Sequence, residues 1–467
     1  MAPTPPAKPV VALILGGTNN IARTLAKYLI EGEPKAQFVR LADRFSVKPA
    51  TTYIDAAFLA LLDAPEAEAK LEYRQVNLAV VERHADVFTP PAQWGGAETG
   101  WTRFDVVFDL TGETGFDKPE LLQISNTYQM ALALATSASK LSDERKPTAY
   151  VRLQQPYYEM KSPSSSSSSQ GHSESDKLKP DGVRGRWWQE TLRGVAAVEG
   201  LNFGIVRSSA WYGPGTWDAE VVPRLVAGHV YQYLEEEMKF LYNSDLRIDT
   251  VHTVDVAQAL YRTALWLSQT PRAQVLKEAG VELAFPFAQP SSSGFLGLGK
   301  RASSSPDTWK TVQTVVPENT KVVAPMFNIR DDGASTQESL AKCVAEVWGI
   351  KFGFMSSTVV LLVEKFAKTD FNEMVEDVNE KHVEAWSQML AKSNPPIIST
   401  PISPFLDAHA FRKMAICLDD SKARKLLGFK PTKARVTANE LRVIAQGFQK
   451  DEIWPTVDLC IWAGARP

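Results

Sequence analysis

A short segment near the N-terminus has the residue types of a phosphate-binding turn. The apolar run Val10–Leu15 has the length of a buried strand, and a glycine pair follows it at once. A strand, tight turn and helix in this order direct main-chain N–H groups and the positive helix end toward a pyrophosphate. The residues that we expect to contact a dinucleotide here are Gly16, Gly17, Thr18, Asn19, Asn20 and Ile21.

The turn departs from the usual three spaced glycines. Gly16 occupies the first of those positions, while Asn19 and Ala22 occupy the other two. Alanine is small enough for contact between helix and strand. Asn19 places a side chain where the main chain would meet phosphate, but asparagine tolerates positive φ angles, so we expect the turn to form.

An acidic residue ends the second strand-like segment, Gln37–Asp43. Asp43 follows Gly16 by 27 residues. Its carboxylate could accept hydrogen bonds from both hydroxyls of an adenosine ribose, which favours NAD. The next residue, Arg44, could instead bind a 2′-phosphate, so NADP remains open as the cofactor.

The elements that must position these residues alternate between apolar runs and helical stretches. Further strands are expected at 73–76, 104–110, 149–153 and 203–207, and helices at 20–29, 121–139 and 187–199. This alternation predicts a doubly wound parallel α/β sheet, the Rossmann arrangement. Helices near 336–348, 359–390 and 420–427 indicate a smaller mixed C-terminal lobe. We therefore expect a dinucleotide-binding domain over 1–215, and lobe segments interleaved with late sheet elements over 216–467.

Two segments interrupt this pattern, at about 162–180 and about 286–307. Both are rich in serine, and the second also in proline and glycine. Neither can bury enough apolar surface to offset the entropy of ordering, so we expect mobile surface insertions.

Composition excludes several classes of protein. The 467 residues carry 51 Lys and Arg against 54 Asp and Glu, a net charge of −3, which excludes a strongly basic nucleic-acid-binding surface. There is no run of eighteen uncharged apolar residues, so no membrane helix is expected, and residues 1–9 lack the apolar core of a secretory signal. The three cysteines lie far apart in the sequence, which favours a reducing compartment such as the cytoplasm. The six histidines lack metal-ligand spacing, so no metal is expected.

Taken in order, the motifs resemble the extended short-chain dehydrogenase/reductase family, in its NAD-dependent epimerase/dehydratase group. The resemblance rests on the turn at 16–22, on 207–214 (Arg-Ser-Ser-Ala-Trp-Tyr-Gly-Pro), on 251–257 (Val-His-Thr-Val-Asp-Val-Ala), and on the late segments 326–329 and 418–429. It implies that Asn77 and Leu78 border the adenine. It also implies that Leu110, Thr111 and Gly112 lie beside the cofactor ribose.

The catalytic residues of that family are missing at their expected places. The family uses a tyrosine of lowered pKa, a lysine four residues later, and a serine or threonine at the end of the fifth strand. Here residues 181–188 contain neither tyrosine nor lysine, and Gln154-Gln155 stands in place of the serines. A literal Tyr-x-x-x-Lys occurs at Tyr157 and Lys161, and Tyr212 follows a strand that should face the cleft.

These three residues are our candidates for proton transfer. Gln154, Tyr158 and Arg247 are the candidates for substrate contact. The resemblance then implies an NAD(P)-dependent oxidoreductase or epimerase/dehydratase-like enzyme with a non-standard site, acting on a nucleotide sugar or a small carbonyl compound. The alternative is a catalytically silent dinucleotide-binding sensor or scaffold. Related proteins often pair through two helices in a four-helix interface, which implies a homodimer.

Overall fold

An eight-stranded sheet forms the centre of the larger domain. The computed structural model describes residues 3–4, 8–31, 35–64, 70–91, 102–162, 171–217, 220–241, 243–287, 308–356, 369–406 and 413–457. Only the edge strand β12 is antiparallel to its neighbour. In spatial order the strands are β12 (Gly280–Glu282), β13 (Val323–Ile329), β8 (Phe203–Ser208), β5 (Ala149–Gln154), β4 (Val106–Asp109), β1 (Val10–Leu15), β2 (Ala36–Asp43) and β3 (Leu71–Gln75).

Strand β1 shows why the sheet is covered on both sides. All six of its residues are buried. Successive side chains of a strand point to opposite faces. Ala12 and Ile14 accordingly belong to one hydrophobic cluster, and Val11, Leu13 and Leu15 belong to another. The order of the strands reverses between β1 and β4, where doubly wound sheets bind their ligands. The predicted Rossmann arrangement is confirmed.

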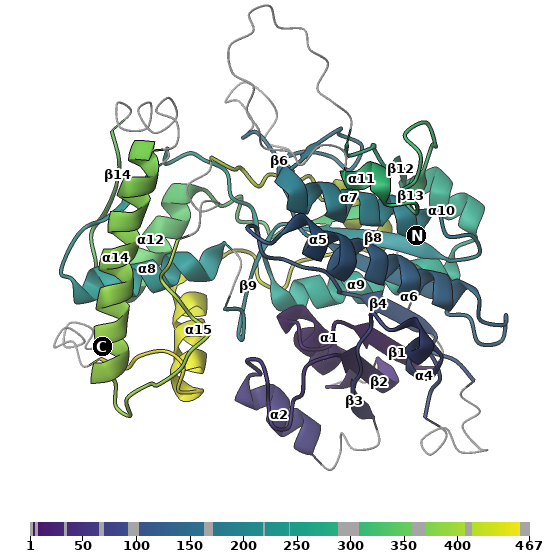
Figure 1. The fold of residues 1–467 in the computed structure, drawn as a ribbon, viewed down its shortest axis with the longest axis horizontal. Coiled ribbons are helices and arrows are strands. Elements are labelled where there is room, and N and C mark those ends of the chain that lie inside the picture. Colours follow the sequence, from purple (N-terminus) through teal and green to yellow (C-terminus); the bar gives the residue numbers. More distant parts are fainter. Residues whose placement is uncertain are drawn as a thin grey trace, which may run out of the picture.

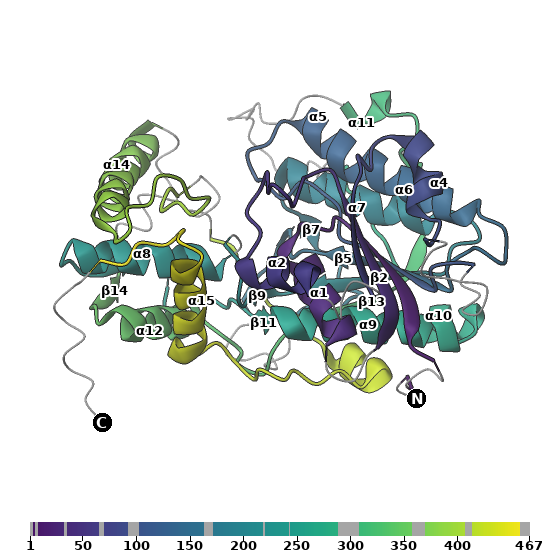
Figure 2. The same cartoon turned by 90° about the horizontal axis from the view of Figure 1, so that it is seen from below.

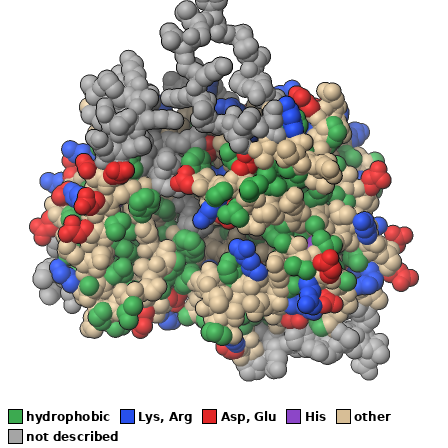
Figure 3. All heavy atoms as spheres, viewed as in Figure 1, with side chains coloured by type: hydrophobic (Ala, Val, Ile, Leu, Met, Phe, Trp, Pro, Cys, Tyr) green, Lys and Arg blue, Asp and Glu red, His purple; other side chains and the backbone are tan. Residues whose placement is uncertain are grey.

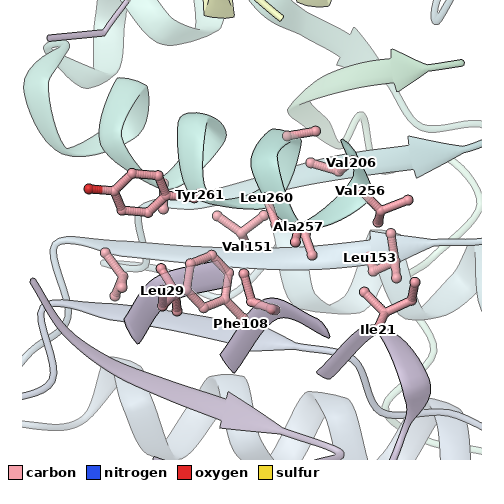
Figure 4. Close-up of a cluster of buried hydrophobic side chains, with 14 of the residues drawn as sticks. Ile21, Leu29, Phe108, Val151, Leu153, Val206, Val256, Ala257, Leu260 and Tyr261 are labelled. Carbon is pink, nitrogen blue, oxygen red and sulfur yellow. The ribbon is translucent and has the colours of Figure 1, made fainter. Parts of the chain in front are cut away.

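Helices cover each face of this sheet (Figures 1 and 2). On the face of Ala12 and Ile14 lie α1 (Asn20–Ile30), α2 (Ala56–Asp63), α9 (Thr253–Gln269) and α10 (Arg272–Ala279). On the other face lie η1 (Val81–Arg83), α4 (His84–Val87), α6 (Met130–Ser139) and α7 (Gly182–Ala196). Figure 4 shows the first of these cores, in which Leu260 of α9 lies over Val151 of β5, and Val256 of α9 lies on the side of Leu153 and Ile21.

The smaller lobe is mostly helical and stands beside the sheet domain, on the left in Figure 1. It consists of α8 (Val221–Tyr233), α12 (Gln337–Trp348), α14 (Thr369–Lys392), α15 (Ala438–Lys450) and the two-stranded sheet of β10 (Met238–Phe240) and β14 (Phe352–Phe354). His229 of α8 is stacked on Trp348 at a centroid distance of 4.0 Å and accepts a hydrogen bond from Nε1 of Trp454 at 2.9 Å. The rings therefore join α8, α12 and the segment after α15.

Several further elements are short. They are β6 (Tyr158–Glu159) with β7 (Lys179–Pro180), β9 (Ala210–Tyr212) with β11 (Thr250–His252), α11 (Thr308–Thr311) and η3 (Ala423–Leu427). In the described part of the chain no helix is long and apolar enough to span a membrane. Charges of both signs are spread over the face shown in Figure 3.

Several boundaries differ from the sequence-based expectations. The stretch expected at 121–139 is α5 (Glu120–Gln123), the π-turn η2 (Ile124–Gln129) and α6 in succession, and α7 begins five residues before Trp187. Of the two expected insertions, residues 163–170 and 288–307 lie outside the described residues. Within 171–180, Glu174 is buried and accepts the N–H of Asn328 at 2.8 Å, so this part of the first expected insertion is packed against the sheet domain.

Candidate functional site

The turn after β1 is held tightly between the ends of β2 and β4. Gly16 has a φ of 83°, and a Cβ atom there would lie 3.0 Å from the carbonyl carbon of Leu110. A Cβ on Gly17 would lie 2.8 Å from the Cβ of Leu41. Both positions therefore require glycine, the first for its backbone angle as well. The turn is brought against Leu110 and Thr111 at the switch point.

Asp43 faces this turn. Its Oδ2 accepts hydrogen bonds from the main-chain N–H of Thr18 at 3.0 Å and from its hydroxyl at 2.6 Å, and Oδ1 accepts the N–H of Arg44 at 2.7 Å. An ionised carboxylate has about four acceptor positions, so one remains for a ribose hydroxyl. The guanidinium of Arg44 lies over the ring of Phe45 at 4.9 Å.

Asn19 caps helix α1. Its Oδ1 accepts a hydrogen bond from the N–H of Ile21 at 2.8 Å, which satisfies one of the free donors at the helix N-terminus. The adjacent Asn20 donates from Nδ2 to Oγ1 of Thr216 at 2.5 Å. The loop after β9 thus approaches the turn from the side of the smaller lobe.

Arg23, in the first turn of α1, is a contact that sequence analysis did not anticipate. It is buried, its Nε lies 2.9 Å from a carboxylate oxygen of Asp55, and Nη1 donates to the carbonyl of Tyr53 at 2.9 Å. Nη2 donates to the carbonyl of Gly215 at 3.3 Å. Arg23 therefore ties the turn to the loop before α2 and to the loop after β9.

The exits of β4 and β5 are joined by a fully buried ion pair. Nη1 of Arg152 lies 2.6 Å from Oδ2 of Asp109, and neither side chain is exposed. Oδ1 of Asp109 accepts both the N–H and the hydroxyl of Thr111, and Nη2 of Arg152 donates to the carbonyl of Thr111 at 2.8 Å. Every polar group of Thr111 is thereby held, so the pair fixes the Leu110–Gly112 segment in place.

Trp188 of α7 lies directly over Gly112. A Cβ on Gly112 would lie 2.5 Å from Cζ2 of Trp188, and Nε1 of this tryptophan donates to the carbonyl of Glu113 at 2.9 Å. The guanidinium of Arg152 lies 5.2 Å from the same ring system. A large ring thus borders the segment at which the resemblance places the cofactor ribose.

Tyr157 meets this group from the exit of β5. Its ring packs edge-on against Trp188 at a centroid distance of 5.3 Å, and the guanidinium of Arg184 lies 3.7 Å from its centroid. Arg184 is buried and also lies 3.7 Å from Asp181. Lys161 is exposed beyond β6, in extended chain, where four residues span about 13 Å. The structure therefore places Arg184, rather than Lys161, next to Tyr157.

Tyr212 is completely buried and lies apart from that group. Its ring packs edge-on against His252 at 5.1 Å, and its hydroxyl has no hydrogen-bond partner among the described residues. Burial raises the pKa of Tyr212 well above its ordinary value, and the nearby carboxylates of Asp331 and Glu440 raise it further.

Of the three candidates for substrate contact, Gln154 ends β5, Tyr158 begins β6, and Arg247 lies in the segment before β11. Gln154 is buried, and its Oε1 has no partner among the described residues. Tyr158 donates its hydroxyl to Oε1 of Gln189 at 2.7 Å, and burial raises its pKa. Nε of Arg247 lies 2.6 Å from Oδ1 of Asp249, while its Nη2 has no hydrogen-bond partner within the described structure.

The two residues expected at the adenine follow β3. Oδ1 of Asn77 accepts the N–H of Ala79 at 3.1 Å, and the carbonyl of buried Leu78 lies 2.9 Å from Nε2 of His84. The N–H of Val76, just before them, donates to the carbonyl of Asp43 at 2.7 Å. This bond keeps the exit of β3 beside the acidic end of β2. The described residues contain no cluster of His, Cys, Asp or Glu that could hold a metal ion.

No protein-family model and no curated protein sequence matches the chain, but solved structures do. A UDP-glucuronic acid 4-epimerase from Bacillus cereus, solved with UDP-glucuronic acid and NAD, is 12% identical, with a TM-score of 0.53 over 94% of this chain and 99% of that one. A dTDP-glucose 4,6-dehydratase from Streptomyces venezuelae, solved with NAD, is 13% identical, with a TM-score of 0.53 over 94% of this chain and 97% of that one.

A UDP-glucose 4-epimerase from Thermotoga maritima, solved with UDP-glucose, is also similar. It is 13% identical, with a TM-score of 0.51 over 94% of this chain and 99% of that one. The chain therefore has the fold of the extended short-chain dehydrogenase/reductases, which the sequence motifs indicated. At these identities the likeness shows the fold.

Proposed function

We propose that the chain is an NAD-dependent oxidoreductase or epimerase/dehydratase-like enzyme that acts on a nucleotide sugar or a small carbonyl compound. The observation that carries this proposal is the arrangement of Gly16–Ile21, Asp43 and Leu110–Gly112 around one point at the switch of the sheet. Three similar structures with bound NAD or nucleotide sugar support it.

The residues present fit NAD better than NADP. Asp43 retains an acceptor position for ribose hydroxyls, and its negative charge would repel a 2′-phosphate. Arg44, the residue that would favour NADP, lies over the ring of Phe45. We therefore propose NAD as the preferred cofactor, with the pyrophosphate on the amides at the start of α1.

Proton transfer falls to Tyr157 in this proposal. Bound NAD would exchange a hydride with a substrate carbon, which requires a proton to move at the attached oxygen. The guanidinium of Arg184, 3.7 Å from the ring centroid of Tyr157, supplies positive charge where the family uses lysine. Because arginine stays protonated near neutral pH, it would stabilise the phenolate while the phenol moves the proton. Gln154, Tyr158 and Arg247 would contact the substrate.

The test is a fluorescence titration with NADH, followed by turnover assays over nucleotide sugars and carbonyl acceptors. Tyr157→Phe should lower turnover by about 100-fold or more, the usual contribution of a general acid, and leave the affinity for NADH unchanged. Tyr233→Phe, on the smaller lobe, serves as the matched control. Absence of NADH binding would contradict the proposal, and unchanged turnover in Tyr157→Phe would remove Tyr157 from it.

A second candidate function is a silent dinucleotide-binding sensor or scaffold. The position of Trp188 over Gly112 supports it, because an indole at the segment proposed to border the cofactor ribose would narrow the space left for the nicotinamide half. If the ring excludes that half, ADP-ribose should bind as tightly as NAD, and no substrate of the panel should be turned over. An enzyme should instead bind NAD more tightly than ADP-ribose and turn over at least one substrate.

A further inference from the structure

The carboxyl ends of β8 and β13 are covered by a segment of the chain itself. We call residues 171–174 the exit segment. The main-chain N–H of His172 donates to the carbonyl of Cys417 at 2.8 Å, and the carbonyl of His172 accepts the N–H of Asp419 at 2.9 Å. The exit segment therefore runs alongside residues 417–419 in the manner of a short parallel strand.

Side chains near the ends of the two sheet strands hold the exit segment in place. In β8, Nη2 of Arg207 donates to the carbonyl of Ser173 at 3.2 Å. In β13, Nδ2 of Asn328 donates to the carbonyl of His172 at 3.0 Å, and the main-chain N–H of Asn328 donates to Oε1 of Glu174 at 2.8 Å. Arg207 and Asn328 are both buried. The exit segment thus takes up donors that a ligand at these strand ends would otherwise use.

Glu174 brings a negative charge to the same place. Its side chain is buried, and Oε2 lies 3.3 Å from Nζ of Lys422. A buried carboxylate is tolerated when it is paired and hydrogen-bonded, and Glu174 is both. The exit segment therefore fills space at the ends of β8 and β13 and also neutralises a nearby lysine. A phosphate group placed there would be repelled by the carboxylate.

The proposed position of the coenzyme decides which way a substrate extends. With the pyrophosphate on the turn after β1 and a ribose on Asp43 of β2, the nicotinamide half extends toward β4 and β5. The reacting part of a substrate then lies at the end of β5, beside Gln154 and Tyr157. In a nucleotide sugar, two phosphates and a nucleoside must continue beyond the sugar. The next strands in the sheet are β8 and β13, whose ends the exit segment covers.

We propose that the exit segment excludes a nucleotide from the substrate site, so that the substrate is a small carbonyl compound without a nucleotide. This inference rests on the proposed function and chooses between the two substrate classes named there. The end of β5 keeps a polar atom for such a compound, because Oε1 of the buried Gln154 has no hydrogen-bond partner among the described residues.

The probes are uridine diphosphate and thymidine diphosphate, which carry the nucleoside and both phosphates of the corresponding nucleotide sugars. Hydrogen exchange is measured on the full chain with and without each probe at millimolar concentration. We expect slow exchange at the amides of His172 and Asp419, unchanged by either probe. A probe bound only in the place of the coenzyme would slow exchange at residues 16–21 alone, which supports the proposal. Slower exchange at residues 171–174 or 417–419 on adding a probe would overturn it.

Calorimetric titration of the NADH-saturated chain with the same probes gives the second readout. We expect no binding, and binding of either diphosphate beside NADH would overturn the proposal. The exchange experiment needs no coenzyme. A chain that failed to bind NADH would therefore contradict the proposed function, while the exchange result would still decide whether the exit segment excludes a nucleotide.

A variant tests whether Glu174 anchors the exit segment. Glu174→Ala removes a charge-assisted hydrogen bond and an ion pair, so exchange at His172 and Asp419 should become about ten-fold faster or more. Glu318→Ala, at an exposed glutamate, is the matched control and should change neither amide. Unchanged exchange in β1 and β4 reports that the variant is folded. A folded Glu174→Ala chain with unaltered exchange at both amides would overturn the proposal. Should the variant not fold, the probe experiments on the unmodified chain still decide it.

Discussion

The side-chain Oδ1 of Asn19 accepts the main-chain N–H of Ile21 at 2.8 Å, at the point where the proposed cofactor would place its pyrophosphate. Asparagine and phosphate would therefore compete for the same donor. A cap of this kind stabilises a helix by about 1 kcal/mol, whereas a hydrogen bond to a charged acceptor contributes about 1.5–3 kcal/mol. We accordingly expect phosphate to displace the side chain.

Substitutions at Asn19 should alter cofactor affinity in opposite directions. Asn19→Gly removes the competitor while costing the helix only a few tenths of a kcal/mol, so NAD should bind about five-fold more tightly. Asn19→Asp keeps the cap and adds a negative charge beside the phosphates, so NAD should bind about ten-fold more weakly. Calorimetric titration measures both. Equal affinities in all three proteins would show that phosphate does not approach this position.

Asp43 should determine the choice between NAD and NADP. Asp43→Asn removes the charge but keeps the shape, and we expect NAD affinity to fall by about 10-fold or more, the value of a charge-assisted hydrogen bond. Affinity for NADP should fall less or rise, because the repulsion of a 2′-phosphate is removed. Asp143→Asn is the control, since it makes the same acid-to-amide change at a fully exposed carboxylate outside the turn. A parallel loss of both cofactors in Asp43→Asn would argue against ribose recognition.

The buried pair of Asp109 and Arg152 should be strongly coupled in stability. Replacing one partner leaves an unpaired buried charge, so Asp109→Leu or Arg152→Met should each lower the free energy of unfolding by about 3–5 kcal/mol. The double variant Asp109→Leu/Arg152→Met should lose less than the sum of the two. Urea denaturation of the four proteins measures this coupling. Additive losses would show that the two side chains do not act as a pair.

His229 should make the smaller lobe sensitive to acid. Burial lowers the pKa of His229 from 6.5 to about 3, so the folded protein keeps this ring neutral. The unfolded chain binds a proton below pH 6.5 and the folded chain does not, so stability falls as the pH drops from 6.5 toward 3. At pH 5 the loss relative to pH 8 should be about 2 kcal/mol.

Denaturation midpoints at pH 8 and pH 5 measure this effect. His229→Gln is the comparison, because glutamine can still accept the hydrogen bond from Trp454 and does not titrate. Between pH 8 and pH 5 the free energy of unfolding of the variant should fall by about 2 kcal/mol less than that of the original chain. An equal loss in both proteins would place the acid sensitivity elsewhere.

Much of the sheet could be predicted because its strands carry local signals. The Val10–Leu15 run is buried on both faces. A strand of this kind is recognisable in a sequence as a continuous run of apolar residues. The start of α7 was placed too late, at Trp187, because two glycines and two arginines precede it, at 182–186, and carry no apolar periodicity. The tertiary contacts of Arg184 and Gly185 decide that boundary.

The candidate site was predictable only where its residues are neighbours in sequence. The turn at 16–21 follows from local pattern, whereas Arg23 acts through Asp55 and Gly215, which are far away along the chain. Arg152 did give a signal, because it is a charged residue within an otherwise apolar strand and therefore needs a buried partner. No spacing rule could have identified that partner as Asp109.

The most direct test of the account is a crystal structure of the chain with NAD. We predict pyrophosphate oxygens within hydrogen-bond distance of the N–H groups of Asn20 and Ile21, a ribose on Asp43, and the side chain of Asn19 turned away from Ile21. A turn that remains empty at saturating NAD, with Oδ1 of Asn19 still on the N–H of Ile21, would contradict the account.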